Sequence, residues 1–453
     1  MPTLTPVLRE RAQTVVVGAV GVFLALALLK FGNPVILDHR LPPPGGFWEY
    51  LIWSWPVAWG YGVLAAVVAL GIWFVRRPEG RLGWVVWLPL AWFVWQCLSA
   101  TQTVRWFLTE ATLKHFAAAV GCFYLGLLVL GRQRNLTPMW LGLLVGFIGV
   151  VKVGFDQHFG GLEATRQFIY AQPNWRDYAQ EFLNKILSDR IYSTLFYPNT
   201  LAGVILLFLP VLLAFILTLP ARAVTRWVLA GAVGSGGLGC LYWSGSKAGW
   251  LMAVLVGAAG WLHAEVGRKT RWLVVILILA AGLGGLVARH SAYFEKGATS
   301  MGARFDCWRV ALASTASHPW LGTGPGTFAV LYSRSRPPEA EPARLAHNDY
   351  LEQACDSGVP GFLLFGALMV GSLILLYRRP GSPAEWVPFC VWLGLAGWAM
   401  HETVEFGLYI PALAWPAFLF LGWLWGLQPT RDPRTAPPGR GTEPRPDPPA
   451  TGC

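Results

Sequence analysis

The sequence has few charged side chains, since Asp, Glu, Lys and Arg make up only 13% of its 453 residues. A soluble globular chain carries roughly 25%. No Asp-x-Asp pair is present to suggest a nucleotide–metal site, and the seven cysteines lack the spacing of a metal site. The basic residues punctuate apolar runs instead of forming a patch, so the net charge of +11 does not indicate nucleic-acid binding.

The chain is instead rich in long apolar runs, and its mean hydropathy is +0.47. Runs of about 20 apolar residues are long enough to cross a bilayer as helices, and many of the 25 tryptophans lie at their ends, as in an interfacial aromatic belt. The sequence therefore predicts an all-α polytopic membrane bundle of about twelve transmembrane helices, surrounded by membrane lipids. The predicted spans lie near residues 14–30, 57–75, 83–99, 115–131, 138–155, 197–218, 225–243, 248–264, 271–288, 358–377, 384–402 and 408–426.

The connections between the predicted spans alternate in charge. By the positive-inside rule, the arginine-rich set faces the cytoplasm. Both termini are then cytoplasmic in a bacterial inner membrane, residues 1–428 form the membrane domain, and the tail 429–453 is predicted to be disordered. The arginine-rich set contains Arg9/Arg11, Arg76/Arg77/Arg81, Arg132/Arg134, Arg222/Arg226, Arg268/Lys269/Arg271 and Arg378/Arg379.

Two long connections, 156–196 and 289–357, fall on the opposite, periplasmic side, and long loops are usually functional. In the first, four apolar residues at spacings of three and four predict a short amphipathic helix along the membrane surface or against the bundle. The second, between the ninth and tenth spans, is expected to be largely helical. The residues of the amphipathic pattern are Trp175, Tyr178, Phe182 and Ile186.

Within the second connection, the pattern predicts a helix from Arg304 to Ser317, with Trp308 and Leu312 on one face. A charged, proline-rich stretch from Arg334 to Arg344 is predicted to be mobile. Cys307 and Cys355 are on the same predicted side of the membrane, so the sequence allows a disulfide between them.

Several side chains able to do chemistry gather on the periplasmic side. Arg190 precedes the sixth span, Lys247 lies in a short hairpin, and Arg304 and His347 belong to the second long connection. Fixed cations suit a diphosphate at the lipid–water interface, and a neutral histidine can take a proton from a hydroxyl. His401 and Glu405, four residues apart, would form a polar pair on a helix that supports this group.

Each of these residues also has a structural alternative. Arg190 could anchor the end of a span, and Lys247 could extend from its hairpin to the lipid headgroups. His347 could cap the helix that follows it, as could Asn348 or Asp349.

From about residue 186 to 426 the chain resembles the O-antigen ligase and O-antigen polymerase superfamily of bacterial membrane glycosyltransferases. The order of several short motifs, together with the long loop after the ninth span, carries this resemblance. The motifs are Arg190 with Tyr197–Ala202, Ser244–Gly249, Arg304 with Trp308 and His318–Gly324, and Ala346–Glu352 with Gly358 and Gly361.

The resemblance implies an enzyme that uses no metal, cofactor or nucleotide sugar and takes its glycan from undecaprenyl diphosphate on the periplasmic face. The essential histidine of the family corresponds to His347, and its two essential basic positions correspond to Arg190 and Lys247. The family usually has arginine where Lys247 stands, and lysine cannot make the bidentate phosphate contact of arginine. We further expect substrate-binding roles for Arg304, Asn199, Asn348, Tyr350, His401 and Glu405.

Ligases of this superfamily transfer the glycan to lipid A–core, whereas O-antigen or exopolysaccharide polymerases transfer it to a second lipid-linked repeat. A ligase with His347 as general base is our first hypothesis and a polymerase is the second. A transporter of lipid-linked glycans would explain the same spans, but it predicts charges midway through several of them, and these spans are nearly free of charge. A scaffold without chemistry would leave the periplasmic histidine and arginines unexplained. The acceptor, sugar, linkage and oligomeric state stay open.

Overall fold

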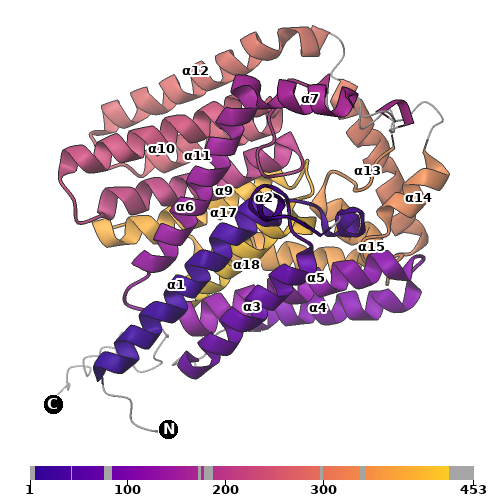
Figure 1. Ribbon diagram of the computed structural model, residues 1–453, viewed down its shortest axis with the longest axis horizontal. Coiled ribbons are helices and arrows are strands. Elements are labelled where there is room, and N and C mark those ends of the chain that lie inside the picture. Colours follow the sequence, from indigo (N-terminus) through magenta and orange to yellow (C-terminus); the bar gives the residue numbers. More distant parts are fainter. Residues whose placement is uncertain are drawn as a thin grey trace, which may run out of the picture.

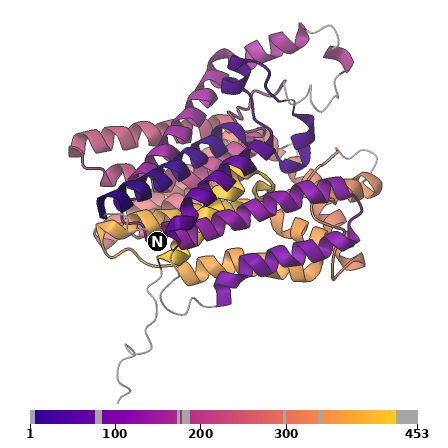
Figure 2. The same ribbon diagram turned by 60° about the horizontal axis from the view of Figure 1, so that its bottom comes forward.

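The computed structural model describes residues 6–41, 43–75, 84–171, 175–177, 187–295, 299–336 and 342–427. Within these ranges the chain forms helices and contains no strand, which confirms the predicted all-α class. The long helices lie side by side in one bundle, and α13, α14 and the start of α15 gather at one end of it (Figures 1 and 2). The predicted disordered tail lies outside the described residues.

Each predicted span coincides with a helix of the structure. In the described ranges, eight helices are long and apolar enough to cross a membrane, and Lys247–Leu262 and Pro411–Gly426 are shorter apolar helices. The chain is therefore a multi-pass membrane protein, and the count of twelve spans stays a prediction. The helices are α1 (Pro6–Lys30), α3 (Val57–Gly71), α4 (Leu88–Ser99), α5 (Trp106–Leu125), α6 (Thr137–Asp156), α9 (Pro198–Thr218), α10 (Ala223–Ser244), α11 (Lys247–Leu262), α12 (Arg268–Glu295), α15 (Asp349–Gly366), α16 (Ser372–Leu376), α17 (Trp386–His401) and α18 (Pro411–Gly426).

Shorter helical elements continue or connect these helices. Seven of them are single turns that extend or precede a long helix: η2 (Ile72–Phe74), η3 (Trp84–Trp87), η4 (Ala100–Gln102), η5 (Gly126–Leu130), η6 (Gln157–Gly161), η8 (Ala367–Gly371) and η9 (Pro383–Glu385). The others lie in connections: η1 (Val35–Arg40), α2 (Phe47–Ile52), α7 (Leu162–Tyr170), η7 (Trp175–Asp177), α13 (Thr299–Ser317), α14 (Phe328–Ser335) and η10 (Gly407–Tyr409).

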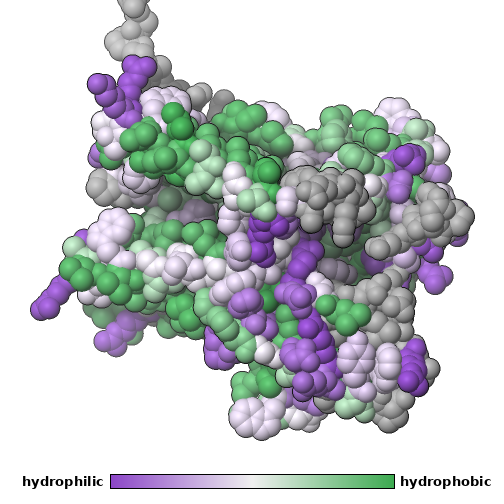
Figure 3. Space-filling view, turned by 90° about the horizontal axis from the view of Figure 1, so that it is seen from above, coloured by the Kyte–Doolittle hydropathy of each residue, from purple (hydrophilic) through white to green (hydrophobic). Residues whose placement is uncertain are grey.

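Helix α18 forms the centre of the bundle, because every residue from Pro411 to Trp425 is buried. Helix α12 lies at the edge, where only 6% of its most apolar window is buried (Figure 1). Seen from above, a band of hydrophobic side chains is flanked by hydrophilic ones at its far left and across the middle of the face (Figure 3). This is the surface expected of a bundle whose outer helices contact lipid.

Glycines let the central helices approach closely, as small residues do in membrane bundles. A Cβ atom added at Gly422 of α18 would lie 1.9 Å from the carbonyl oxygen of Phe123 in α5. A Cβ atom at Gly394 of α17 would lie 2.2 Å from the carbonyl oxygen of Leu207 in α9. Both contacts are with backbone, which cannot move aside without shifting a helix.

We expect Gly422→Leu to destabilise the protein by at least about 1–3 kcal/mol, because it overpacks a helix crossing against backbone atoms. The thermal unfolding midpoint of the purified protein in detergent measures this loss. Gly231→Leu is the matched control, since no atom lies within 4 Å of a Cβ placed there. Equal midpoints for the two variants would show that α5 and α18 do not pack as described.

The first long connection begins later than predicted. Helix α6 continues through η6 into α7, with a kink at Phe159 and Gly160, where Gly160 adopts a φ of 128°. Of the predicted amphipathic helix, Trp175 lies in η7, and Tyr178, Phe182 and Ile186 lie outside the described residues.

The second connection contains the predicted helix, which α13 extends from Thr299 to Ser317. Trp308 packs against a cluster that includes Cys307 of α13 and Phe328 and Tyr332 of α14, whereas Leu312 is exposed. Cys307 and Cys355 are both free thiols, so the disulfide that the sequence allowed between them is not formed. The predicted mobile stretch includes the last turn of α14, and residues 337–341 lie outside the described ranges.

Candidate functional site

Glu405 lies at the centre of a polar network, in the turn between α17 and α18, with a side chain only 6% exposed. Arg304 of α13 forms an ion pair with its Oε1 atom and donates from Nε to the carbonyl of Val404 at 3.0 Å. Asn199, in the first turn of α9, donates from Nδ2 to the same Oε1 at 2.6 Å. On the other carboxylate oxygen, Oε2, the Nδ1 atom of His347 lies 3.6 Å away. Four segments distant in sequence therefore meet at one carboxylate.

Arg190 joins this network through the hairpin between α10 and α11. Its Nε donates to the carbonyl of Ser244 at 2.7 Å, and its Nη2 donates to Oδ1 of Asn199 at 2.6 Å. Gly245 has a left-handed φ of 61°, and a Cβ there would lie 3.2 Å from the Arg190 Nε. Glycine at this position therefore allows both the turn and the close approach of the guanidinium.

Lys247 is the first residue of α11. Ser246 caps this helix by accepting the N–H of Gly249 at 3.2 Å, so the hairpin has a defined shape. The charge of Lys247 interacts with those of Arg190 and Arg304. Arg190 and Arg304 thus belong to the network around Glu405, and Lys247 lies near enough for its charge to interact with theirs.

Two further basic residues at the end of α12 belong to the same region. The guanidinium of Arg289 lies 3.7 Å from the ring centroid of Tyr242 and donates to the carbonyl of Tyr242 at 3.3 Å. His290 interacts electrostatically with Lys247 and Arg190. The predicted span ends at residue 288, and no role was predicted for either residue. Their position directly after an apolar run, on the side with few other charges, was the available signal.

The charges in this network perturb one another. Burial lowers the pKa of the Arg190 guanidinium and Arg304 lowers it further, whereas Glu405 opposes both. For Glu405, burial raises the pKa, but His347, Arg304 and His401 outweigh it and hold the value at about 2. The carboxylate is therefore ionised throughout the physiological range of pH.

This low pKa gives Glu405 a predictable effect on stability. A carboxyl whose pKa is lowered on folding stabilises the protein above its unfolded value of 4.5, and this contribution is lost as pH falls toward about 2. We expect the loss between pH 6 and pH 3 to be about 2 kcal/mol larger in the wild type than in Glu405→Gln. Thermal unfolding of both proteins across this range measures the difference. Parallel curves of stability against pH for the two proteins would show that the neighbouring cations do not lower the pKa of Glu405.

His347 has an unusual backbone conformation. Its φ is 52°, which is uncommon for a residue other than glycine. Its carbonyl accepts the indole N–H of Trp308 at 3.3 Å, and its ring packs edge-on to Phe406 with centroids 4.8 Å apart. The alternative that His347 caps α15 is wrong, because Asn348 is the N-cap and accepts the N–H of Leu351 at 3.0 Å.

Two other predicted substrate-binding residues lie beside the network instead of in it. The hydroxyl of Tyr350 donates to the carbonyl of Ala399 in α17 at 3.2 Å. His401 is 1% exposed and is the last residue of α17, so the predicted helical pair with Glu405 does not form. Its Nδ1 lies 3.6 Å from Oε1 of Glu402 instead. Substrate contact by Tyr350 and His401 stays a prediction.

Four buried carboxylates hold the loops around His347 and Glu405. Helix α15 begins earlier than the predicted span and carries three of them, while Glu402 accepts the N–H of Gly407. Within the described ranges, no group of three His, Cys, Asp or Glu side chains could hold a metal ion; metal independence stays a prediction. On α15, Asp349 accepts the N–H of Leu408 at 2.7 Å, Glu352 that of Ala346 at 2.7 Å, and Asp356 that of Gly326 at 2.6 Å.

A segment of the chain that carries part of this site is similar to a known protein family. Residues 232–366 match the family model described as O-antigen ligase, a segment that contains Lys247, Arg304 and His347. A protein of Haemophilus influenzae (strain Rd), described as uncharacterized, is 30% identical over 164 residues, which cover 30% of this chain and 38% of that relative. The chain therefore matches well under half of the relative's length. The match supports the resemblance of this segment to the O-antigen ligase superfamily, and the membrane helices of the chain agree with it.

Proposed function

We propose that this protein transfers a glycan from undecaprenyl diphosphate to a hydroxyl group of lipid A–core on the periplasmic face of the inner membrane. The observation that carries the proposal is the network at Glu405, which gathers Arg190, Arg304 and His347 at one end of the bundle. Such a group combines cations for a diphosphate with a base for a hydroxyl.

The distribution of arginines supports the proposed orientation of the protein in the membrane. Arg226 lies in the first turn of α10, whose other end leads into the hairpin that holds Lys247, and Arg268 begins α12, at the opposite end from His290. The positive-inside rule assigns such arginine-rich ends to the cytoplasm. The network then faces the periplasm, and both termini face the cytoplasm.

In the proposed complex, the polyprenyl tail lies in the bilayer and the diphosphate lies between Arg190 and Lys247. Arg190 is held from two sides, by Ser244 and Asn199, so its charge is positioned before the donor binds. Preorganised charges stabilise a developing anion without reorganising during the reaction. These cations, with Arg304, favour departure of the lipid diphosphate and need no metal.

His347 is the proposed general base. Its Nδ1 lies 3.6 Å from Oε2 of the ionised Glu405, and the side chain is 32% exposed. Nε2 takes the proton of the acceptor hydroxyl as its oxygen bonds to the anomeric carbon. The bond from that carbon to the diphosphate oxygen breaks, and its electron pair leaves with the lipid diphosphate. Glu405 stabilises the protonated ring, and this single displacement inverts the anomeric centre.

Purified protein tests this proposal when it is mixed with undecaprenyl-diphosphate-linked glycan, first alone and then with lipid A–core. We expect product and released lipid diphosphate only when lipid A–core is present. Lengthened glycans from the donor alone would establish the polymerase instead. Intact donor in both mixtures, with donor bound to the protein, would overturn transfer and favour a transporter.

A further inference from the structure

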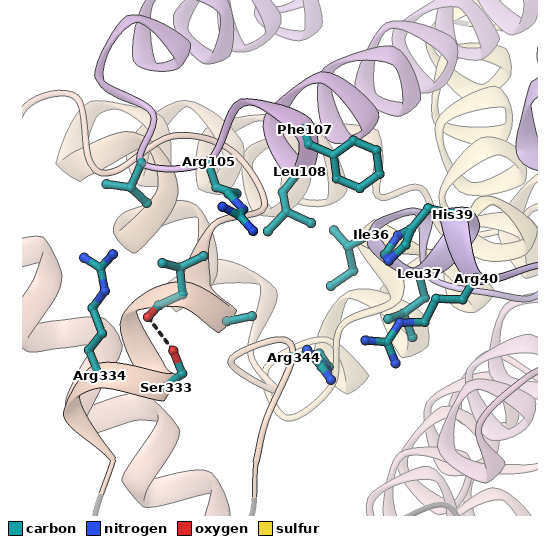
Figure 4. A pocket seen from close by; sticks show the side chains of 13 residues that line it. Ile36, Leu37, His39, Arg40, Arg105, Phe107, Leu108, Ser333, Arg334 and Arg344 are labelled. Atoms are coloured by element: carbon teal, nitrogen blue, oxygen red, sulfur yellow. Dashed lines mark hydrogen bonds between the residues drawn. The ribbon is translucent and has the colours of Figure 1, made fainter. Parts of the chain in front are cut away.

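A second group of cations surrounds an open pocket of about 490 Å³ at the same end of the bundle. Arg40 ends η1, Arg105 precedes α5, Arg334 lies in the last turn of α14, and Arg344 lies three residues before His347. Figure 4 shows their side chains around one opening, with Arg40 and Arg344 on one side and Arg105 and Arg334 across from them. Four arginines from four separate segments thus converge outside the network at Glu405.

These arginines are not neutralised by the part of the protein that the structure describes. Among the described residues, no acidic side chain lines the pocket, and none of the four guanidinium groups has an ion pair or side-chain hydrogen bond to any of them. Asp38, the nearest carboxylate in sequence, accepts the N–H of Val57 at 2.9 Å. A cleft lined by one sign of charge attracts and concentrates ligands of the opposite sign.

An aromatic surface accompanies the arginines. Phe107 is 52% exposed, and its ring meets that of His39 edge-on, with centroids 5.1 Å apart. An exposed aromatic ring can pack against the C–H face of a sugar, and the planar fork of arginine matches a phosphate or carboxylate. The combination suits a sugar that carries an acidic group better than it suits a free anion.

The pocket also lies close to the proposed base. Arg344 and His347 are separated by three Cα–Cα steps, so their Cα atoms are at most about 11 Å apart. The segment between them is held in place, since Leu345 and Ala346 are buried and the N–H of Ala346 is bound by Glu352. The edge of the pocket at Arg344 therefore lies at a fixed, short distance from His347. The donor diphosphate has its own cations in Arg190 and Lys247, and neither lines this pocket.

We propose that Arg40, Arg105, Arg334 and Arg344 bind an acidic sugar, bearing a phosphate or carboxylate, of the acceptor glycan. This assignment rests on the proposed function, because it makes the pocket the acceptor side of the same transfer site. Selection of an acidic acceptor follows, since a neutral glycan would leave the four cations without a counter-charge beyond what the described residues supply.

Binding of glucose 6-phosphate and of glucose tests the pocket without any transfer step. The full-length protein is placed in phosphatidylcholine nanodiscs, and binding is followed by ligand-observed NMR. We expect the wild type to bind glucose 6-phosphate more tightly than glucose. The double variant Arg105→Gln/Arg334→Gln should bind glucose 6-phosphate at least 10-fold more weakly than the wild type does. Arg309→Gln is the matched control, an exposed arginine of α13 outside the pocket, and it should bind as the wild type does.

The transfer assay supplies the second readout. The double variant should raise the KM for lipid A–core about 10-fold while kcat stays near the wild-type value. Unchanged binding and unchanged KM would overturn the pocket assignment and leave the proposed function standing. Loss of glucose 6-phosphate binding in nanodiscs that contain phosphatidylglycerol would also overturn it, since the pocket would then hold a lipid headgroup. The wild type could instead bind glucose 6-phosphate through these arginines and yet transfer no glycan. This result would support the acidic-sugar site and reject the proposed function.

Discussion

Glycan transfer falls at least about 10²–10⁴-fold when His347 is replaced by alanine, because the acceptor hydroxyl loses the base that removes its proton. The protein should stay folded, since the side chain is 32% exposed and makes no hydrogen bond to a described residue. Release of undecaprenyl diphosphate from the donor measures the loss, and the thermal unfolding midpoint measures the fold.

Two variants sharpen this experiment. His347→Asn removes the base but suits the φ of 52°, since asparagine tolerates this region better than most residues; it should be as inactive as the alanine variant. His318→Ala changes an exposed histidine of the same connection, whose backbone alone is hydrogen-bonded, and should keep full activity. Folded His347→Asn protein that still transfers glycan would exclude proton removal by His347.

The second large effect is expected for Glu405→Gln, with transfer reduced at least about 10²-fold. Loss of the carboxylate beside the catalytic histidine costs about 10⁴-fold in Ser-His-Asp hydrolases, where it orients and stabilises the protonated ring. Here the same change also removes the ion pair between Arg304 and Glu405 and alters the partner of Asn199. Glu405 is thus a positioning residue, and kcat should fall more than the affinity for the acceptor changes.

Rescue by a conservative variant separates this role from a purely structural one. Glu405→Asp keeps a negative charge near His347 and should recover part of the transfer activity, whereas Glu405→Gln should not. A folded Glu405→Gln variant with the wild-type rate would show that Glu405 has no part in transfer.

Much of the site could be predicted from the sequence because its residues sit in short local motifs. Arg190, Lys247, Arg304 and His347 were identified in this way, and the structure brings them together. The position of Glu405 at their centre could not be predicted, because its partners lie far away in sequence: Arg304 is 101 residues from it and Asn199 is 206. The helical pair predicted for Glu405 failed because α17 ends at His401.

The same limit applies to the arginine pocket and to the cap of α15. Arg40, Arg105, Arg334 and Arg344 come from separate segments, and no sequence pattern relates them. Asn348 and not His347 caps α15, and this depends on backbone angles that both residue types can adopt.

The sequence by itself determined the all-helical membrane class and the approximate place of each long helix, because the length and apolarity of a span are local properties. It also determined the helix of the second long connection, which ends before Pro319. Only the tertiary structure decided that α18 is buried at the centre while α12 faces outward, although both are apolar. The physical reason is that lipid tails are as apolar as a protein interior, so hydrophobicity cannot tell a lipid-facing helix from a central one.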